Sequence, residues 1–360
     1  MSISFPENGC MMTRRQFVKS TAAGSAGLAL LGWPSGRTEA LQKYPHWGKV
    51  VVVQDEAATE GPNISQNAVQ SMLDEAIHAL TDGGGWRSLF PSYRSGETVA
   101  IKVNSVARLM TTHWEVIESI VGGLVGIGVR QNDIIIWDTS AFTMTAPGYV
   151  LTNEPRGVRV MGGDQLKDPY DQTRPLDLEG KKACLSRILI DATYLINAPV
   201  LKDHWEAGIT FALKNHVGSV DNPRKLFHHP PEEGNMLHTM LGRGRPKHAC
   251  IAAINSAPDI QKKTRLIVGD ALFGIYQGGP AGSPQFTYNG LIVGNDPVAT
   301  DHQARLIIDE QRAKHGKAPT DPLHIEEAIR LGLGAPINEI RVLPVHRKKR
   351  SRRRTDERTN

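Results

Sequence analysis

Short, almost wholly apolar runs that alternate with helical patterns constrain the fold of this chain more than any other feature. Three of them are clear, at residues 48–54 (G-K-V-V-V-V-Q), 98–104 (T-V-A-I-K-V-N) and 133–138 (D-I-I-I-W-D). Runs without a polar face are typical of strands buried on both sides, which occur in parallel sheets covered by helices. The sequence therefore predicts an α/β fold with a mostly parallel sheet and helices on both faces.

The rest of the chain continues this alternation. Further strands are predicted at 156–161, 193–198, 265–270, 290–294 and 339–345. Helices are predicted where apolar side chains recur at three- and four-residue steps, at 65–81, 113–127, 297–313 and 323–332. Residues 221–249 are rich in Pro, His, Gly and Arg and lack periodicity. We expect an irregular excursion over the surface, or a lid, at 221–249.

The net charge of +5 is concentrated at the two ends of the chain. Residues 1–40 hold four basic and two acidic side chains, and residues 346–360 hold eight basic and two acidic ones. The part between them, 41–345, therefore has a small excess of acidic side chains. Domains that bind nucleic acid normally present a basic face, so we expect no nucleic-acid partner. Residues 346–360 have no apolar side chain and are expected to form a disordered basic tail.

The first 40 residues resemble a twin-arginine export signal. Arg14 and Arg15 are followed by Phe17 and by an apolar stretch of small residues at 20–33, and small residues flank Glu39 where a signal peptidase would read. The apolar stretch is shorter than the roughly 20 residues that span a bilayer, so no stable transmembrane anchor is predicted. The resemblance implies passage through the twin-arginine translocase, removal of 1–40, and a periplasmic or extracellular location.

Polar residues follow the predicted strands at the points where these end. Lys102 and Asn104 end one strand, and Lys202, His204 and Lys214 follow another. In open α/β sheets, ligand sites form beyond the carboxyl ends of the strands. Ammonium groups with neutral donors beside them suit an anionic ligand such as a phosphate or a carboxylate. The alternative is that these lysines are simply solvated.

Six segments occur in an order that resembles a known family. They are V-A-I-K-V-N (99–104), L-I-N-A-P-V-L-K-D-H (195–204), F-A-L-K-N-H-V-G (211–218), G-D-A-L-F-G (269–274), G-G-P (278–280) and G-N-D-P-V-A-T-D (294–301). Together they resemble the bacterial and archaeal family called domain of unknown function 362, which implies one α/β domain of that type over 41–345. Some members add an iron–sulfur module. This chain has three cysteines and no C-x-x-C pair, so it cannot hold such a cluster alone.

The resemblance implies a set of site residues, to which we assign roles. His204 is the expected catalytic group, together with Lys202 and Lys214. The expected cofactor- or substrate-binding residues are Lys102, Asn104, Asn215, Asp270 and Asp301. Asp270 would orient a lysine or bind a divalent cation, with a structural role as the alternative. Asp296, before Pro297, is predicted to cap the helix at 297–313.

Metal and nucleotide sites have weaker support in the sequence. A second group of histidines, His228, His229, His238 and His248, could form a zinc or iron site, although scattered surface histidines are the simpler interpretation. The spacing of a P-loop and the glycine fingerprint of a dinucleotide fold are both absent from the sequence. The cofactor is unassigned: a bound metal or a nucleotide-like anion is compatible with the pattern.

The sequence thus predicts an exported α/β protein with a Lys/His/Asn-lined cleft for a small anionic substrate or cofactor. A redox or isomerising enzyme is the favoured interpretation. The alternative is a non-catalytic periplasmic ligand-binding or cell-envelope accessory protein, and a third interpretation places the function in the basic tail. The order strand, T-x-H, helix, strand, Asp is also distantly similar to the lactate racemase family, whose members hold a nickel-bearing nucleotide. That likeness is one of fold and does not assign the activity.

Overall fold

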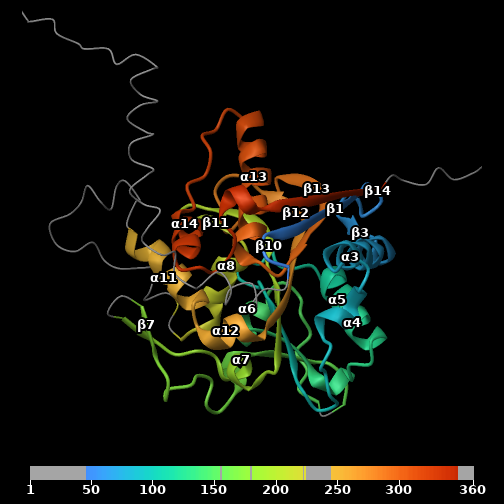
Figure 1. Ribbon diagram of the computed structural model, residues 1–360, viewed down its shortest axis with the longest axis vertical. Coiled ribbons are helices and arrows are strands. Elements are labelled where there is room, and N and C mark those ends of the chain that lie inside the picture. The colour runs from blue at the N-terminus through green and yellow to red at the C-terminus, as the bar shows by residue number, and fades with distance from the viewer. Residues whose placement is uncertain (1–45, 155, 179–180, 222, 224–244, 348–360) are drawn as a thin grey trace, which may run out of the picture. The chain divides into compact units, whose positions relative to one another are not determined.

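The computed structural model describes residues 46–154, 156–178, 181–221, 223 and 245–347, which are built around one large sheet (Figure 1). Its strands are β1 (Lys49–Asp55), β4 (Val99–Val103), β5 (Ile134–Asp138), β6 (Arg159–Gly162), β9 (Tyr194–Ala198), β10 (Val200–His204), β11 (Gly208–Thr210), β12 (Thr264–Ile275), β13 (Phe286–Gly294) and β14 (Arg341–Arg347). They lie in the order β14-β1-β13-β12-β9-β4-β5-β6, and β10 joins β11 to β12. Two small hairpins lie outside this sheet. One pairs β2 (Thr59–Glu60) with β3 (Asn63–Ile64), and the other pairs β7 (Leu176–Leu178) with β8 (Lys181–Ala183).

Most of the sheet is parallel. The run β12-β9-β4-β5-β6 is parallel throughout, as are β1 with β14 and β10 with β12. Strand β13 is the main exception, since it pairs antiparallel with both β1 and β12. The prediction of an α/β fold with a mostly parallel sheet is confirmed.

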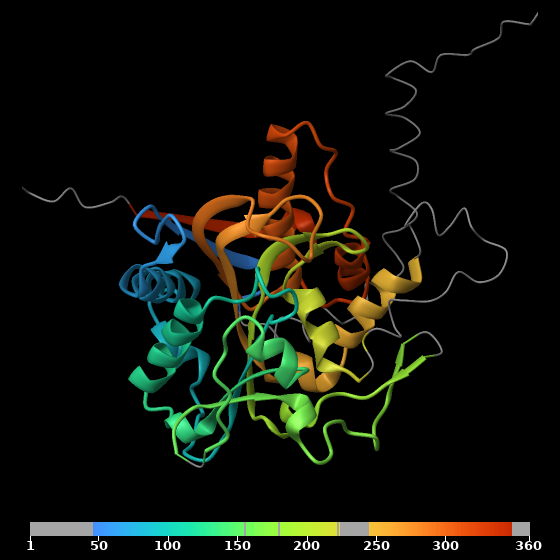
Figure 2. The ribbon, with the colours of Figure 1, turned by 180° about the vertical axis from the view of Figure 1, so that it is seen from behind.

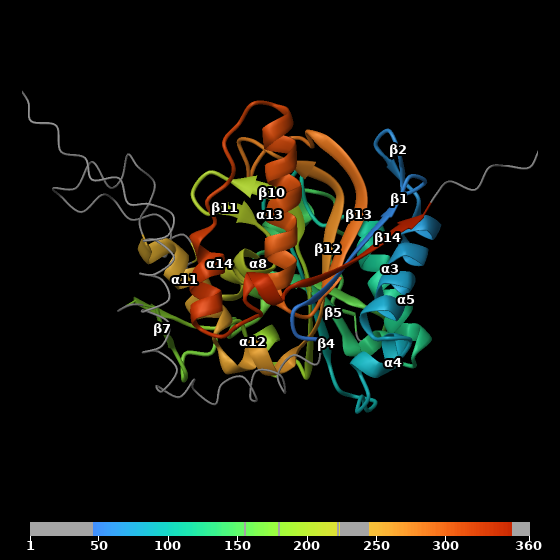
Figure 3. The same ribbon diagram turned by 45° about the horizontal axis from the view of Figure 1, so that its top comes forward.

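Helices cover both faces of this sheet, as the turned view in Figure 3 shows. On one face lie α3 (Gln66–Leu80), α4 (Gly85–Leu89) and α5 (Trp114–Gly126). On the other lie α8 (Ala212–Asn215), α11 (Arg245–Asn255), α12 (Pro258–Lys263), α13 (Pro297–Lys314) and α14 (Leu323–Arg330), seen from behind in Figure 2. The short helices α6 (Ala141–Thr145) and α7 (Arg187–Asp191) follow β5 and β8. Each face has its own cluster of buried apolar side chains, because successive residues of a strand point to opposite sides.

The helix ends follow from local chemistry. Ser65 accepts a hydrogen bond from the backbone N–H of Ala68 and caps α3. Asp296 accepts from the backbone N–H groups of Val298 and Ala299 and caps α13, as predicted. Helix α11 begins at Arg245, inside the segment that was expected to be irregular.

Several expectations fall on residues that the structure does not describe. These are the export signal at 1–40, residues 224–244 of the excursion, and residues 348–360 of the tail. Strand β14 itself runs on to Arg347. Among the described residues, none of the helices combines the length and the apolar character needed to cross a membrane.

The strand order marks one place for a site. From β4 the chain passes through α5 to β5 on one side, whereas β9 pairs with β4 on the other side. The carboxyl ends of β4 and β9 therefore lie where the order of the strands reverses, which is where open α/β sheets bind ligands.

Candidate functional site

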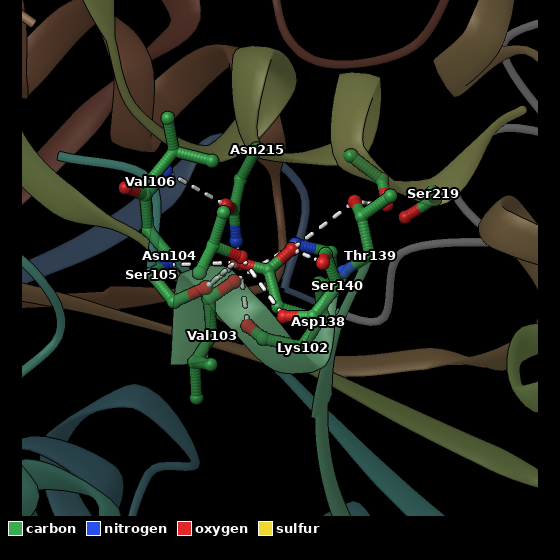
Figure 4. Close-up of polar contacts among 12 residues, drawn as sticks. Lys102, Val103, Asn104, Ser105, Val106, Asp138, Thr139, Ser140, Asn215 and Ser219 are labelled. Atoms are coloured by element: carbon green, nitrogen blue, oxygen red, sulfur yellow. Dashed lines mark hydrogen bonds and ion pairs between the residues drawn. The ribbon is translucent and has the colours of Figure 1, made fainter. Parts of the chain in front are cut away.

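A buried ion pair joins the ends of β4 and β5. The Nζ atom of Lys102 lies 2.6 Å from Oδ1 of Asp138, and each side chain is 2% exposed. The other carboxylate oxygen, Oδ2, accepts hydrogen bonds from the backbone N–H of Ser105 (2.8 Å) and from its hydroxyl (2.7 Å) (Figure 4). Burial alone would raise the pKa of Asp138, but the Lys102 ammonium and the Ser105 donors hold it below its ordinary value. Asp138 is therefore a carboxylate at neutral pH.

Lys202, on β10, holds the loop that follows β4. Its ammonium group donates to three neutral oxygens, which are Oδ1 of Asn104 (2.9 Å) and the carbonyl oxygens of Val106 (3.0 Å) and Met110 (2.9 Å). An ammonium has three hydrogens, so all of them are used. Among the described residues no carboxylate forms an ion pair with Lys202.

A chain of amide side chains continues from this lysine. Asn104 donates to Oδ1 of Asn215 (3.0 Å), and Asn215 donates to Oδ1 of Asn197 (2.7 Å). Asn197 in turn donates to the carbonyl oxygen of Ala212 in α8 (2.9 Å). The chain ties the ends of β4 and β9 to the start of α8; Figure 4 shows its first two members, Asn104 and Asn215.

The positive charges of this network act on one another. Burial and, to a smaller extent, the charge of Lys214 lower the pKa of Lys202 to about 7, against an opposing effect of Asp138. Burial also lowers the pKa of Lys214 to about 8, although Glu206 acts to raise it. Burial, assisted by Lys102, lowers the pKa of His216 to about 3, so that imidazole is neutral. The region has a positive potential.

Asp301 and His204 lie apart from the amide chain. Asp301 is fully buried in α13 and accepts hydrogen bonds from the backbone N–H groups of Ala212 (2.7 Å) and Leu213 (3.3 Å) at the start of α8. His204 ends β10, and its Nδ1 accepts from the backbone N–H groups of Glu206 (3.1 Å) and Ala207 (3.2 Å). It lines a cleft of about 250 Å³ that is separate from the buried amides.

Asp270 has a partner that the sequence analysis missed. Its Oδ2 atom accepts from the backbone N–H of His113 and lies 2.7 Å from Nδ1 of the same histidine. Burial acts to lower the pKa of His113, but the charges of Asp270 and Glu115 outweigh it and raise the pKa. His113 stands directly before α5 in the run T-T-H-W. The signals in the sequence were this position, between a strand and a helix, and the T-x-H order noted above.

The predicted residues are thus distributed over four places. Lys102, Asn104, Lys202 and Asn215 form one network, with Lys214 close enough to act on it. Asp270 pairs with His113, Asp301 accepts hydrogen bonds from the first backbone N–H groups of α8, and His204 lies in its own cleft. Within the described part of the chain, no three His, Cys, Asp or Glu side chains are grouped so that they could hold a metal ion. Of the second histidine group, His248 stacks on His324 with ring centroids 5.9 Å apart, and the others lie outside the described residues.

A comparison with known families assigns the chain to one of them. The model of the family described as Domain of unknown function (DUF362) matches residues 99–305, more than half of the chain. No curated protein matches the sequence. Two similar solved structures are a protein from Thermotoga maritima (12% identity, TM-score 0.39, 69% of this chain and 60% of that one) and the lactate racemase apoprotein from Thermoanaerobacterium thermosaccharolyticum (12% identity, TM-score 0.41, 72% and 57%). The chain therefore spans less than two thirds of the length of either.

Proposed function

Because this chain belongs to the DUF362 family, whose description names no reaction, we propose its function from the site: it is an enzyme that binds a small anionic substrate or cofactor beyond the carboxyl ends of β4, β5 and β9. One observation carries this proposal, the excess of buried positive charge. The charge of Lys102 is balanced by Asp138. The ammonium of Lys202 donates to neutral oxygens alone, and the positive charge of Lys214 repels it. A buried charge without a counter-charge is unfavourable, and a bound anion would supply one.

The contacts suggest a division of labour among these residues. Lys202 has all three ammonium hydrogens engaged and holds the loop after β4 in place. Lys102 donates to the carbonyl oxygen of Val103 and to Asp138. Both would act on the anion through their positive charge. Lys214 would bring a further positive charge to the anion, because its charge already acts on Lys202, and Asn104 and Asn215 would hold the surrounding elements in place. His204 lies two positions from Lys202 on β10 but lines a cleft of its own, so it would transfer a proton to a substrate that extends into that cleft. A redox or isomerising reaction fits this set best.

Anion binding tests the proposal. Inorganic phosphate and acetate are titrated into the full-length protein by calorimetry. The variants are Lys214→Gln and, as a control that removes the same charge from an exposed pair, Lys314→Gln. We expect Lys214→Gln to weaken phosphate binding by about tenfold or more and Lys314→Gln to leave it unchanged. Equal affinity in the two variants would remove the basis of the proposal.

The pH dependence gives a second check. Lys202 and Lys214, with pKa values lowered to about 7 and about 8, gain protons as the pH falls from 9 to 6. Binding of acetate, whose charge does not change over that range, should therefore strengthen. Native mass spectrometry of protein isolated from its own cells would show whether a small molecule accompanies it.

The alternative, a non-catalytic binding protein, is favoured by one observation: all three hydrogens of Lys202 are engaged, as in a rigid binding site. The two functions differ at His204. In an enzyme, His204→Gln abolishes turnover of the bound molecule and spares its affinity. In a binding protein it changes the affinity only modestly.

We also propose that the protein is exported by the twin-arginine route to the periplasm or beyond. The paired Arg14 and Arg15 and the short apolar stretch after them support this proposal. Replacing both arginines by lysine should retain the protein in the cytoplasm. Secretion of that double variant at the normal level would contradict the proposal.

A further inference from the structure

A cleft of about 690 Å³ opens beside α5, on the face of the sheet opposite to Lys102. Its floor includes Ile136 and Val160, which belong to the core cluster under α3 and α5, whereas Ala100 and Trp137, on the face that Lys102 shares, belong to the other cluster. The volume is typical of sites for small molecules. Among the described residues that line it there is none of the three site lysines. The cleft is thus distinct from the site proposed above.

The walls of this cleft are apolar and largely aromatic or β-branched. Trp114 and Tyr149 meet edge to face, with ring centroids 5.9 Å apart. The hydroxyl of Tyr149 donates to the carbonyl oxygen of Thr112 (2.6 Å), so its polar end is already satisfied. The apolar lining from α5, β5 and β6 consists of Trp114, Ile117, Val121, Ile136 and Val160. Such walls favour a flat, apolar body.

One end of the cleft carries an imidazole that a buried carboxylate holds in place. His113 lines the cleft, and its side chain is 23% exposed. Asp270, which is fully buried, holds its Nδ1 at 2.7 Å, so the ring is fixed in one orientation and its other nitrogen, Nε2, is left for a ligand. Among the described residues none bonds to Nε2. Asp270 is meanwhile satisfied by His113 and by the backbone N–H of Leu272 (3.2 Å).

We propose that this cleft is a binding site for a small molecule that joins a flat apolar body to an anionic group, with the imidazolium of His113 as the partner of that group. The charged groups that face His113 are Asp270 on β12 and Glu115 and Glu118 on α5. Asp270 and Glu115 keep the ring protonated to a higher pH than usual, because they raise its pKa. Glu118 is exposed at the mouth of the cleft, where solvent screens its repulsion of an anion.

Three probes separate the two halves of the ligand. These are 2-naphthoate, which has both the ring and the charge, 2-naphthylmethanol, which has the ring alone, and acetate, which has the charge alone. They are titrated into the full-length protein labelled with ¹³C and ¹⁵N at histidine. We expect 2-naphthoate to shift the ring signals of His113 and to bind about tenfold more tightly than the alcohol. Acetate should bind weakest, and binding of 2-naphthoate should weaken as the pH rises through the pKa of His113.

Variants then assign the interaction to these residues. His113→Gln should abolish the preference for 2-naphthoate over the alcohol, whereas His315→Gln, which removes an exposed imidazole directly after α13, should keep it. Glu118→Gln should strengthen 2-naphthoate binding about twofold. Val121→Trp, at a partly exposed wall position, should weaken both naphthyl probes without affecting acetate. Urea midpoints show that each variant is folded.

Two results would overturn the proposal. The first is a preference for 2-naphthoate that survives His113→Gln in the folded protein. The second is naphthyl binding that Val121→Trp leaves unchanged, which would place the probes elsewhere on the surface. The outcome does not depend on Lys214→Gln, so the lysine site and this cleft can fail separately.

Discussion

Replacement of Asp138 by Asn tests the buried network most directly. The change removes the charge that balances Lys102. It also puts an amide NH₂ in place of one carboxylate oxygen, and each of these oxygens accepts a hydrogen bond from a backbone N–H, of Thr139 at Oδ1 and of Ser105 at Oδ2. One N–H donor would then face another donor. Both side chains are 2% exposed, so solvent cannot take over the lost role. Removing one partner of a buried ion pair costs about 3–5 kcal/mol. We expect Asp138→Asn to lower the free energy of unfolding by that amount, measured by urea denaturation at pH 7.

A double-mutant cycle isolates the pair itself. Lys102→Met removes the ammonium, and in that background Asp138→Asn no longer leaves an unbalanced charge. The loss of stability in the double variant should therefore be about 2–3 kcal/mol smaller than the sum of the losses in the two single variants. Glu310→Gln is the control, because Glu310 pairs with Lys314 at the surface, where the side chains are 62% and 54% exposed. Such pairs contribute about 0–1 kcal/mol.

The pH dependence of this variant has a definite sign. The pKa of Asp138 is lowered in the folded state, so its stabilising effect is complete above the unfolded value near 4 and is lost as the pH falls through the lower, folded value. The stability difference between wild type and Asp138→Asn should therefore shrink below pH 4. Losses that are fully additive in the cycle, or a difference that does not change with pH, would refute the account of the network.

Three further changes test other parts of the site. A Cβ atom at position 218 would lie 3.1 Å from Nζ of Lys102, so Gly218→Ala should destabilise the protein by about 1–3 kcal/mol in urea; no loss would mean that the loop relaxes freely. Asp296→Ala leaves four buried backbone N–H groups without an acceptor, so its loss in urea should exceed the roughly 1 kcal/mol of an ordinary helix cap; a smaller loss would show that other groups accept them. Asp270→Asn should lower the pKa of His113, as measured by NMR titration, because the carboxylate raises this pKa in the wild type. An unchanged pKa would show that Asp270 and His113 do not interact in solution.

Much of the fold could be predicted because its signals are local. The run 133–138 is apolar between its two terminal aspartates and contains β5, and the periodicity at 65–81 corresponds to α3. The antiparallel pairing of β13 with β1 and β12 could not be predicted in the same way. Strand direction depends on how the chain returns between strands, and an apolar run looks the same in either direction.

The site was only partly accessible to sequence reasoning. Lys102 and Asn104 follow a strand, and their place at the edge of the sheet follows from the rule for carboxyl ends. What each side chain touches does not follow from that rule. Asp270 was expected to orient a lysine or bind a cation, but it meets His113, which lies 157 positions away along the chain. A single sequence contains no signal that links two such distant residues.

The free-energy cost of burying charge indicates that Lys102 and Lys202 have a role other than stabilising the fold. Apolar side chains of similar volume often stabilise a core as well as a buried ion pair does, so stability alone does not explain Lys102 and Asp138 at this edge. Lys202 makes the argument stronger, because its charge is buried against neutral oxygens and beside Lys214. The ammonium form of Lys202 is therefore disfavoured in the folded protein, which is why its pKa is lowered to about 7, and a bound anion would stabilise that form. Binding and stability are therefore linked, and an anion that occupies the site should raise the melting temperature with its concentration.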